Sequence, residues 1–148
     1  MLYNRILLIA LIAWFGTQIA KTIIFWVVNR TFTPERFFGD GGMPSGHSAV
    51  VAAVATATGL ECGWNSPLFA VAAILAVIVM HDASGVRQET GKQAKVINDL
   101  VKTMQAIGHG ELTPEQSLKE FVGHTGLQVM VGALGGVVTA VVMNMILP

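Results

Sequence analysis

Residues 41–48, Gly-Gly-Met-Pro-Ser-Gly-His-Ser, place an imidazole, hydroxyls and backbone amides at the start of an apolar run. Proline suits the first position of a helix, where its missing N–H would have no partner, so Pro44 predicts a helix start. A helix N-terminus presents unpaired N–H groups and the positive end of its dipole, which together bind phosphate. Ser45 adds a hydroxyl, Gly46 lets an anion approach the backbone, and His47 titrates near neutral pH. The segment predicts an anion site and favours a phosphatase.

The composition is that of an integral membrane protein. Of 148 residues, 53% are hydrophobic and 12% are charged, whereas soluble domains carry about 25% charged residues. We expect one integral membrane domain over residues 1–148, whose first apolar stretch spans the membrane and is not a cleaved signal. The net charge is zero, so nothing indicates a nucleic-acid partner. The single cysteine, Cys62, excludes an internal disulfide and a cysteine-based zinc site.

Four apolar segments predict an all-α, polytopic membrane helix bundle with about four transmembrane spans. They cover residues 6–28, 44–60, 67–80 and 126–147. The middle two form a helical hairpin, and each is near or below the roughly 17 residues that a spanning helix needs. We therefore expect both to continue into their loops or to sit inside protein. Glycines in the last segment leave a smooth face for close helix contact.

The polar connection at residues 83–125 is too long for a plain loop and predicts amphipathic helices. Apolar residues recur every three or four positions over residues 89–107, which indicates one amphipathic helix there. Thr113 and Pro114 supply an N-cap and a first helical proline. A second, shorter helix is therefore expected from residue 114 to about residue 122.

With four spans, the connections at residues 29–43 and 83–125 lie on one side of the membrane. That side holds seven of the nine basic residues and, with its boundary, three of the four histidines. Such a surface suits an anionic substrate. The positive-inside rule places it in the cytoplasm, although cations that bind substrate would raise the same count. In a bacterium the membrane would be the inner, or plasma, membrane.

Lys21 lies inside the first apolar segment. A charge within a span is costly, so we expect Lys21 to face a polar cavity, with Gln18 one turn earlier on the same side. The alternative is that the lysine snorkels to the nearby interface, since only a few apolar residues follow it.

The remaining histidines differ in what they could do. His124 lies at the boundary of the last span and could accept a phosphoryl group if Gln128, one turn later, held its other nitrogen. On position alone, a histidine that caps a helix is the commoner explanation. His81 and Asp82 are adjacent and do not face each other, so we expect Asp82 to pair with Arg87 instead. His109 lies between glycines, and we expect it to be solvated. No cluster of histidines or carboxylates at ligand spacing appears, so we expect no metal and no cofactor.

These residues resemble the divergent membrane branch of the type 2 phosphatidic acid phosphatase superfamily, which includes the vanadium haloperoxidases. The resemblance runs in order through nearly the whole chain. It is carried by Gln18-x-x-Lys21, Gly41-Gly42-Met43-Pro44-Ser45-x-His47-Ser48-Ala49, Asp82-Ala83-x-Gly85-Val86-Arg87, Gly91-x-Gln93-Ala94-x-Val96-x-Asn98 and Leu118-Lys119-Glu120-x-x-Gly123-His124.

The resemblance implies a catalytic set of His124 as the nucleophile that attacks phosphorus, His47 as the general acid, and Gln128 beside the nucleophile. It implies a substrate-binding set, in which Ser45 and the Gly46 amide bind phosphate and cationic side chains hold its oxygens. The full substrate-binding set is Lys21, Ser45, Gly46, Arg87, Lys119, Asp82 and Lys92.

Three departures from the superfamily pattern bear on catalysis. The superfamily has an arginine six residues before its nucleophile, whereas Lys119 is five residues before His124. The acid that orients the nucleophile is replaced by Gln128, which supports a positive imidazole less strongly. The arginine-proline pair of the first signature is missing, although Arg30 or Arg36 could substitute.

Two functions from different classes follow. The first is a metal-independent membrane phosphatase that hydrolyses a lipid phosphate through a phosphohistidine, on phosphatidic acid, phosphatidylglycerol phosphate or a polyprenyl (pyro)phosphate. The second is a protein that binds or moves a lipid phosphate among the membrane lipids without hydrolysing it, which Gln128 favours. Because four spans are few to enclose a site, we also expect a homodimer.

Overall fold

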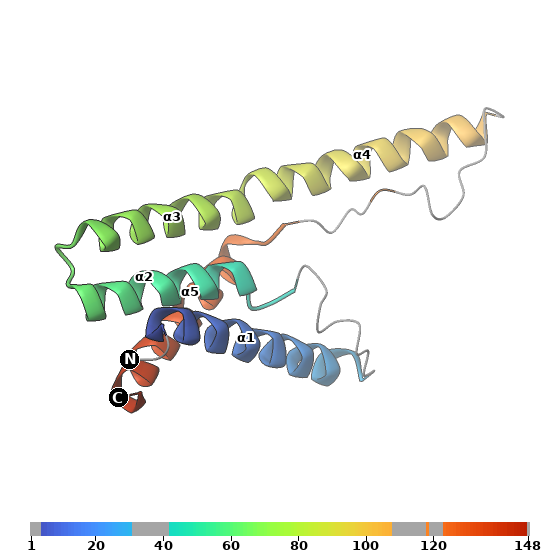
Figure 1. Cartoon of the computed structure of the whole chain (residues 1–148). Coiled ribbons are helices and arrows are strands. Elements are labelled where there is room, and N and C mark those ends of the chain that lie inside the picture. Colours follow the sequence, from blue (N-terminus) through green and yellow to red (C-terminus); the bar gives the residue numbers. More distant parts are fainter. Residues whose placement is uncertain (1–3, 31–41, 108–117, 119–122, 148) are drawn as a thin grey trace.

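The computed structural model of the chain describes residues 4–30, 42–107, 118 and 123–147 (Figure 1). These residues form α-helices and no strand, which confirms the all-α prediction. The helices are α1 (Arg5–Asn29), α2 (Gly46–Cys62), α3 (Pro67–Ser84), α4 (Val86–Ala106) and α5 (Gly126–Ile146).

Three helical stretches of the described chain are long and apolar enough to cross a membrane. They are Arg5–Asn29, the continuous α3–α4 stretch Pro67–Ala106, and Gly126–Ile146. The 17-residue α2 is shorter and packs against α1, α3 and α5. The short segment expected at residues 44–60 is therefore α2, which packs inside the protein against the three long stretches, as expected. The chain is an all-α membrane protein.

Small side chains let α2 lie deep inside the bundle. Ala49, Ala53 and Ala57 on α2 are almost fully buried. Across the contact, Gly136 of α5 faces Ala49 and Gly132 faces Ser45. A Cβ at Gly136 would collide with the carbonyl oxygen of Ala49, so the two backbones touch directly. Close backbone approach of this kind drives helix association in membranes, where burial of apolar surface gives little gain.

The start of α2 differs from the prediction. Pro44 is not the first helical residue, because Ser45 is the N-cap and Gly46 begins the helix. The Ser45 hydroxyl accepts hydrogen bonds from the Ser48 amide at 3.4 Å and from the Ser48 hydroxyl at 2.9 Å. A serine that satisfies an orphan amide in this way is a strong helix start. The helix dipole therefore points into the Gly42–Ser45 turn, as predicted, but begins two residues later.

The helix α4 continues the direction of α3 beyond the bundle, with a break at Gly85 (Figure 1). The predicted amphipathic helix is confirmed, and it begins three residues earlier than expected. One stripe of α4, namely Gly91, Ala94 and Asn98, is buried. The Asn98 amide donates to the Leu118 carbonyl at 2.9 Å and accepts from the Leu118 amide at 3.1 Å. Apart from Leu118, the second helix expected at residues 114–122 lies outside the described residues.

The helix ends that carry the polar residues lie together on one side of the bundle. Figure 1 shows the end of α1, the start of α2, the α3–α4 junction and the start of α5 at the same end of the packed helices. Hydrogen bonds tie three of these points together. The His124 amide donates to the Ala83 carbonyl at 2.9 Å, and the Ser45 amide donates to the Gln128 carbonyl at 3.1 Å.

Candidate active site

The N-terminus of α2 supplies donors for an anion. Ser45 is fully buried and its hydroxyl oxygen is used as the helix cap, so this serine shapes the turn. The amides of Gly46 and His47 make no hydrogen bond within the described part of the chain. They are therefore free to bind a phosphate oxygen, helped by the helix dipole. The His47 side chain is exposed at the same turn.

His124 and Gln128 lie one helical turn apart at the start of α5. The His124 side chain is buried, with 7% of its surface exposed. Its Nδ1 atom lies 3.3 Å from Oε1 of Gln128. The same Oε1 accepts the Thr125 amide at 3.0 Å, while the Thr125 hydroxyl accepts the Gln128 amide at 3.4 Å. This reciprocal pair is a capping box, which holds the glutamine in place.

The capping box also determines the tautomer of His124. Because the Thr125 N–H donates to the Gln128 side chain, the contacting atom must be the amide oxygen and not the amide nitrogen. An oxygen only accepts, so Nδ1 of His124 carries the proton and donates to it. In the neutral imidazole, Nε2 then keeps its lone pair. That nitrogen is the one available to attack an electrophile.

The surroundings of His124 favour the neutral ring. Burial lowers the pKa of His124 below its ordinary value, since the charged form loses hydration. The hydrogen bond to Gln128 opposes that shift, and the positive charges of Lys21, His47 and Arg87 add to it. Lys21, Arg87 and, when it is protonated, His47 therefore act on this imidazole. The arrangement holds a neutral imidazole beside a group of cations.

This pKa shift gives a pH prediction. We expect the acid limb of kcat/KM to have its midpoint below pH 6.5, the ordinary histidine value, because free His124 stays neutral to lower pH. The folded state then binds fewer protons than the unfolded chain just below pH 6.5, so stability falls as the pH drops through that window. A pH series of initial rates and of thermal unfolding measures both. An acid midpoint at or above pH 6.5 would contradict the prediction.

Gly123 fixes where His124 sits. Its φ of +94° lies in the left-handed region that favours glycine. A Cβ there would lie 2.7 Å from the Arg87 carbonyl carbon and 2.8 Å from Cα of Gln88. The backbone before His124 therefore rests directly on the first turn of α4. Gly123 therefore helps to position the imidazole, as does the Thr125 cap that holds Gln128.

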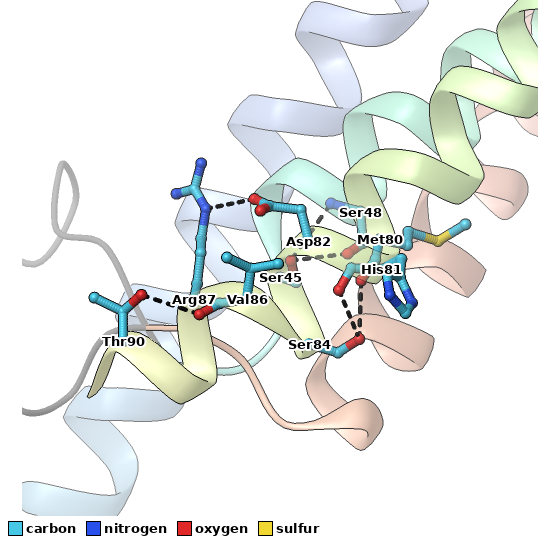
Figure 2. Close-up of polar contacts among 9 residues, drawn as sticks. All are labelled: Ser45, Ser48, Met80, His81, Asp82, Ser84, Val86, Arg87 and Thr90. Carbon is cyan, nitrogen blue, oxygen red and sulfur yellow. Dashed lines mark hydrogen bonds and ion pairs between the residues drawn. The ribbon is translucent and has the colours of Figure 1, made fainter. Parts of the chain in front are cut away.

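The predicted substrate-binding cations differ in burial and in their partners. Lys21 is buried, with 7% of its surface exposed, and its Cγ lies 3.7 Å from the position of a Cβ on Gly42. Burial favours a cavity-facing lysine over a snorkelling one. Arg87 donates through Nε to Oδ2 of Asp82 at 2.8 Å, with both side chains about half exposed. This confirms the expected Asp82–Arg87 ion pair, which Figure 2 shows at the α3–α4 junction.

Lys92 is an exposed residue of α4 that pairs with Glu89 at 2.6 Å. It is not among the charges that shift the pKa of His124, so the structure does not bring it to the imidazole. Lys119 and His109 lie outside the described residues. His81 is exposed, and its ring points away from the Asp82 carboxylate in Figure 2, as expected for adjacent helix residues. Within the described ranges, no group of three or more His, Cys, Asp or Glu side chains is placed to hold a metal.

Sequence reasoning missed Gly123 and Thr125 as positioning residues. The signal for Thr125 was present, since Thr-x-x-Gln before an apolar run is the capping-box pattern. For Gly123 no local signal existed, because the backbone that it contacts is 35 residues earlier in the chain.

Comparison with known proteins identifies the family of the chain. The sequence profile described as "Divergent PAP2 family" matches residues 2–139. A protein named "Uncharacterized membrane protein YuiD" from Bacillus subtilis (strain 168) is 40% identical over 151 residues, covering 97% of this chain and 96% of that protein. No solved structure gives a significant match. The profile spans all five helices up to the last turns of α5, and with it the α2 turn and the His124 segment, so this chain belongs to the divergent PAP2 family.

Proposed function

We propose that the protein hydrolyses a lipid phosphate through a phosphohistidine on His124. The observation that carries the proposal is the hydrogen-bonded His124–Gln128 pair, which leaves the Nε2 lone pair free beside the cations. Membership of a PAP2-related family supports it, as does the amide-lined start of α2. Phosphoryl transfer needs mainly positioning and charge stabilisation, which these groups supply.

The proposed reaction has two balanced steps. First, Nε2 of His124 attacks phosphorus, the N–P bond forms, and the P–O ester bond breaks. Protonated His47 gives its proton to the departing oxygen, which leaves as an alcohol. Second, water attacks phosphorus and gives a proton to the now neutral His47. The N–P bond breaks, its electron pair returns to Nε2, and inorganic phosphate leaves. Lys21, Arg87 and the α2 amides hold the phosphate oxygens throughout.

A groove beside Lys21 supports a lipid substrate. It has a volume of about 150 Å3 and lies between the second half of α1 and the turn before α2. Apart from Lys21 and Asn29 its side chains are apolar, and they include Ile24, Phe25, Val28 and Met43. An apolar groove that reaches a buried cation suits a molecule with a hydrocarbon segment attached to a phosphate. We propose that the headgroup meets Lys21 while the first part of the tail lies in this groove.

Phosphate release tests the function. We expect detergent-purified protein to release inorganic phosphate from phosphatidic acid, phosphatidylglycerol phosphate or a polyprenyl phosphate, and more slowly from glycerol 3-phosphate, which has no tail. Faster release from glycerol 3-phosphate than from every lipid would overturn the lipid assignment. No release from any substrate, with the protein folded, would overturn hydrolysis.

A non-hydrolytic role is the second candidate, and one contact favours it. The Gln128 oxygen near Nδ1 of His124 is neutral and is shared with the Thr125 amide. A neutral, shared acceptor stabilises the developing imidazolium less than a carboxylate would. On this alternative, the site binds or moves a lipid phosphate without cleaving it. Saturable binding of a lipid phosphate without release of inorganic phosphate would decide in its favour.

The orientation of the protein in the membrane is also a proposal. We propose that the His124 side of the bundle faces the cytoplasm, because seven of the nine basic residues lie on its connections.

A further inference from the structure

Gln18 of α1 is a buried polar residue that the proposed reaction does not use. Its side chain is 6% exposed. Its Oε1 atom is buried and has no hydrogen-bond partner among the residues that the structure describes. Buried acceptors are almost always satisfied in folded proteins, and leaving one without a donor destabilises the fold. Oε1 of Gln18 therefore needs a hydrogen-bond donor, which the described residues do not supply.

The neighbours of Gln18 along α1 contact the anion-binding turn. The Thr17 methyl group lies 4.0 Å from the position of a Cβ on Gly46, the first residue of α2. Lys21, one turn after Gln18, lies against Gly42 and acts on His124. Residues three apart on a helix share a side. Gln18 is thus at the height of the α2 N-terminus, on the buried side of α1 that also carries Thr17 and Lys21.

In the proposed reaction the lone pair of neutral His124 faces phosphorus, and the groups that hold the oxygens of the anion are hydrogen-bond donors. They are the α2 amides, the Lys21 ammonium and the Arg87 guanidinium, with the His47 imidazole as a further donor when protonated. An oxygen acceptor among donors repels a bare anion oxygen and binds an oxygen that still carries a proton. A phosphate monoester has its second pKa at about 6, so near neutral pH part of it keeps a P–O–H group. Inorganic phosphate also keeps a proton near neutral pH, whereas sulfate keeps none.

We propose that Oε1 of Gln18 accepts a hydrogen bond from a protonated oxygen of the bound phosphate, and so makes the site selective for phosphate over sulfate. The inference rests on the phosphate site of the proposed function but not on hydrolysis. It assigns the acceptor that the donor set lacks, and it gives the buried oxygen a partner.

Binding of two inorganic anions tests the proposal. Calorimetric titration of the full-length, detergent-purified protein with inorganic phosphate and with sulfate at one neutral pH keeps the histidine protonation the same for both. We expect the wild type to bind phosphate at least about tenfold more tightly than sulfate, an effect of the size of one hydrogen bond to a charged ligand. Equal affinities in the wild type would overturn the proposal without any variant.

The matched variants are Gln18→Met, which removes the acceptor at similar volume, and Gln93→Met, the same change at an exposed residue of α4. Gln18→Met should lose about tenfold in phosphate affinity and none in sulfate affinity, and its melting temperature without ligand should not fall. Gln93→Met should change neither affinity. Equal loss for both anions, or a fall in melting temperature with unchanged binding, would make Gln18 a structural residue.

The two proposals fail separately. Phosphate selectivity without phosphate release from any lipid would support the role of Gln18 and overturn hydrolysis. Histidine-dependent release without selectivity over sulfate would support hydrolysis and overturn the role of Gln18.

Discussion

Replacing His124 with alanine is expected to lower phosphate release at least about 10³-fold, because the variant has no nucleophile to form the phosphoenzyme. Among the described residues, the His124 side chain makes one hydrogen bond, to Gln128, and it lies before the first turn of α5. Removing it should therefore leave the helices in place. Initial rates of phosphate release measure the loss, and rapid quenching under alkaline conditions, which preserve a phosphohistidine, measures the intermediate directly.

Replacing His47 with alanine separates its role from that of His124. A general acid matters most when the leaving group is a poor one, such as the alcohol of a lipid. We expect His47→Ala to lose about 10²- to 10⁴-fold on a lipid phosphate but far less on an aryl phosphate, whose phenolate leaves without a proton. His124→Ala should lose both activities alike. The two substrates therefore distinguish acid from nucleophile.

His81→Ala is the matched control for both variants. His81 is an exposed histidine in the last turn of α3, and its ring points away from Asp82 (Figure 2). Its loss should leave phosphate release unchanged. Substantial release by purified His124→Ala would exclude His124 as the nucleophile, and equal losses of His47→Ala on both substrates would exclude His47 as the acid.

Much of the fold followed from local signals. The apolar runs, the tight turn before Pro67 and the three-to-four-residue repeat in α4 each predicted a helix within a few residues of its observed bounds. The helix start predicted at Pro44 was two residues too early. Ser45, one residue later, is the N-cap, and this cap determines the first turn of α2. The close contact of α2 with α5 could not be predicted. It depends on glycines of α5 more than 80 residues later in the chain, whose partners a local pattern does not identify.

In the candidate site, too, contacts within one segment could be predicted and contacts between distant segments could not. The pairing of Asp82 with Arg87 and of His124 with Gln128 came from spacing along one segment, and both contacts are present. The contact of Gly123 with Arg87 and Gln88 joins distant segments, and no spacing rule reaches it. For Lys92, substrate binding stays a prediction. Its charge suggested that role, and in the structure it is an exposed residue of α4 that pairs with Glu89.

Alanine at Gly136 is expected to destabilise the protein by about 1–3 kcal/mol, the usual cost of overpacking a close contact. The new methyl group would meet the Ala49 carbonyl oxygen and lie 2.9 Å from the Ala49 carbonyl carbon, and helix backbone cannot move aside as a flexible side chain can. To relieve the collision, α5 must separate from α2 along a contact built on small residues. Thermal unfolding in one detergent, followed by circular dichroism, measures the change.

Gly132→Ala and Gly135→Ala show whether Gly136→Ala is destabilised by the collision or by the loss of glycine itself. At Gly132 the methyl group would press on the Ser45 backbone, so this variant should be destabilised as well and should also bind phosphate more weakly, because the α2 N-terminus moves. At Gly135 nothing lies within 4 Å of the new methyl group. Alanine there should be neutral or stabilise the helix by up to about 1 kcal/mol, since glycine is the poorer helix former. Equal melting temperatures for all three variants would mean that α2 and α5 do not pack through this glycine face.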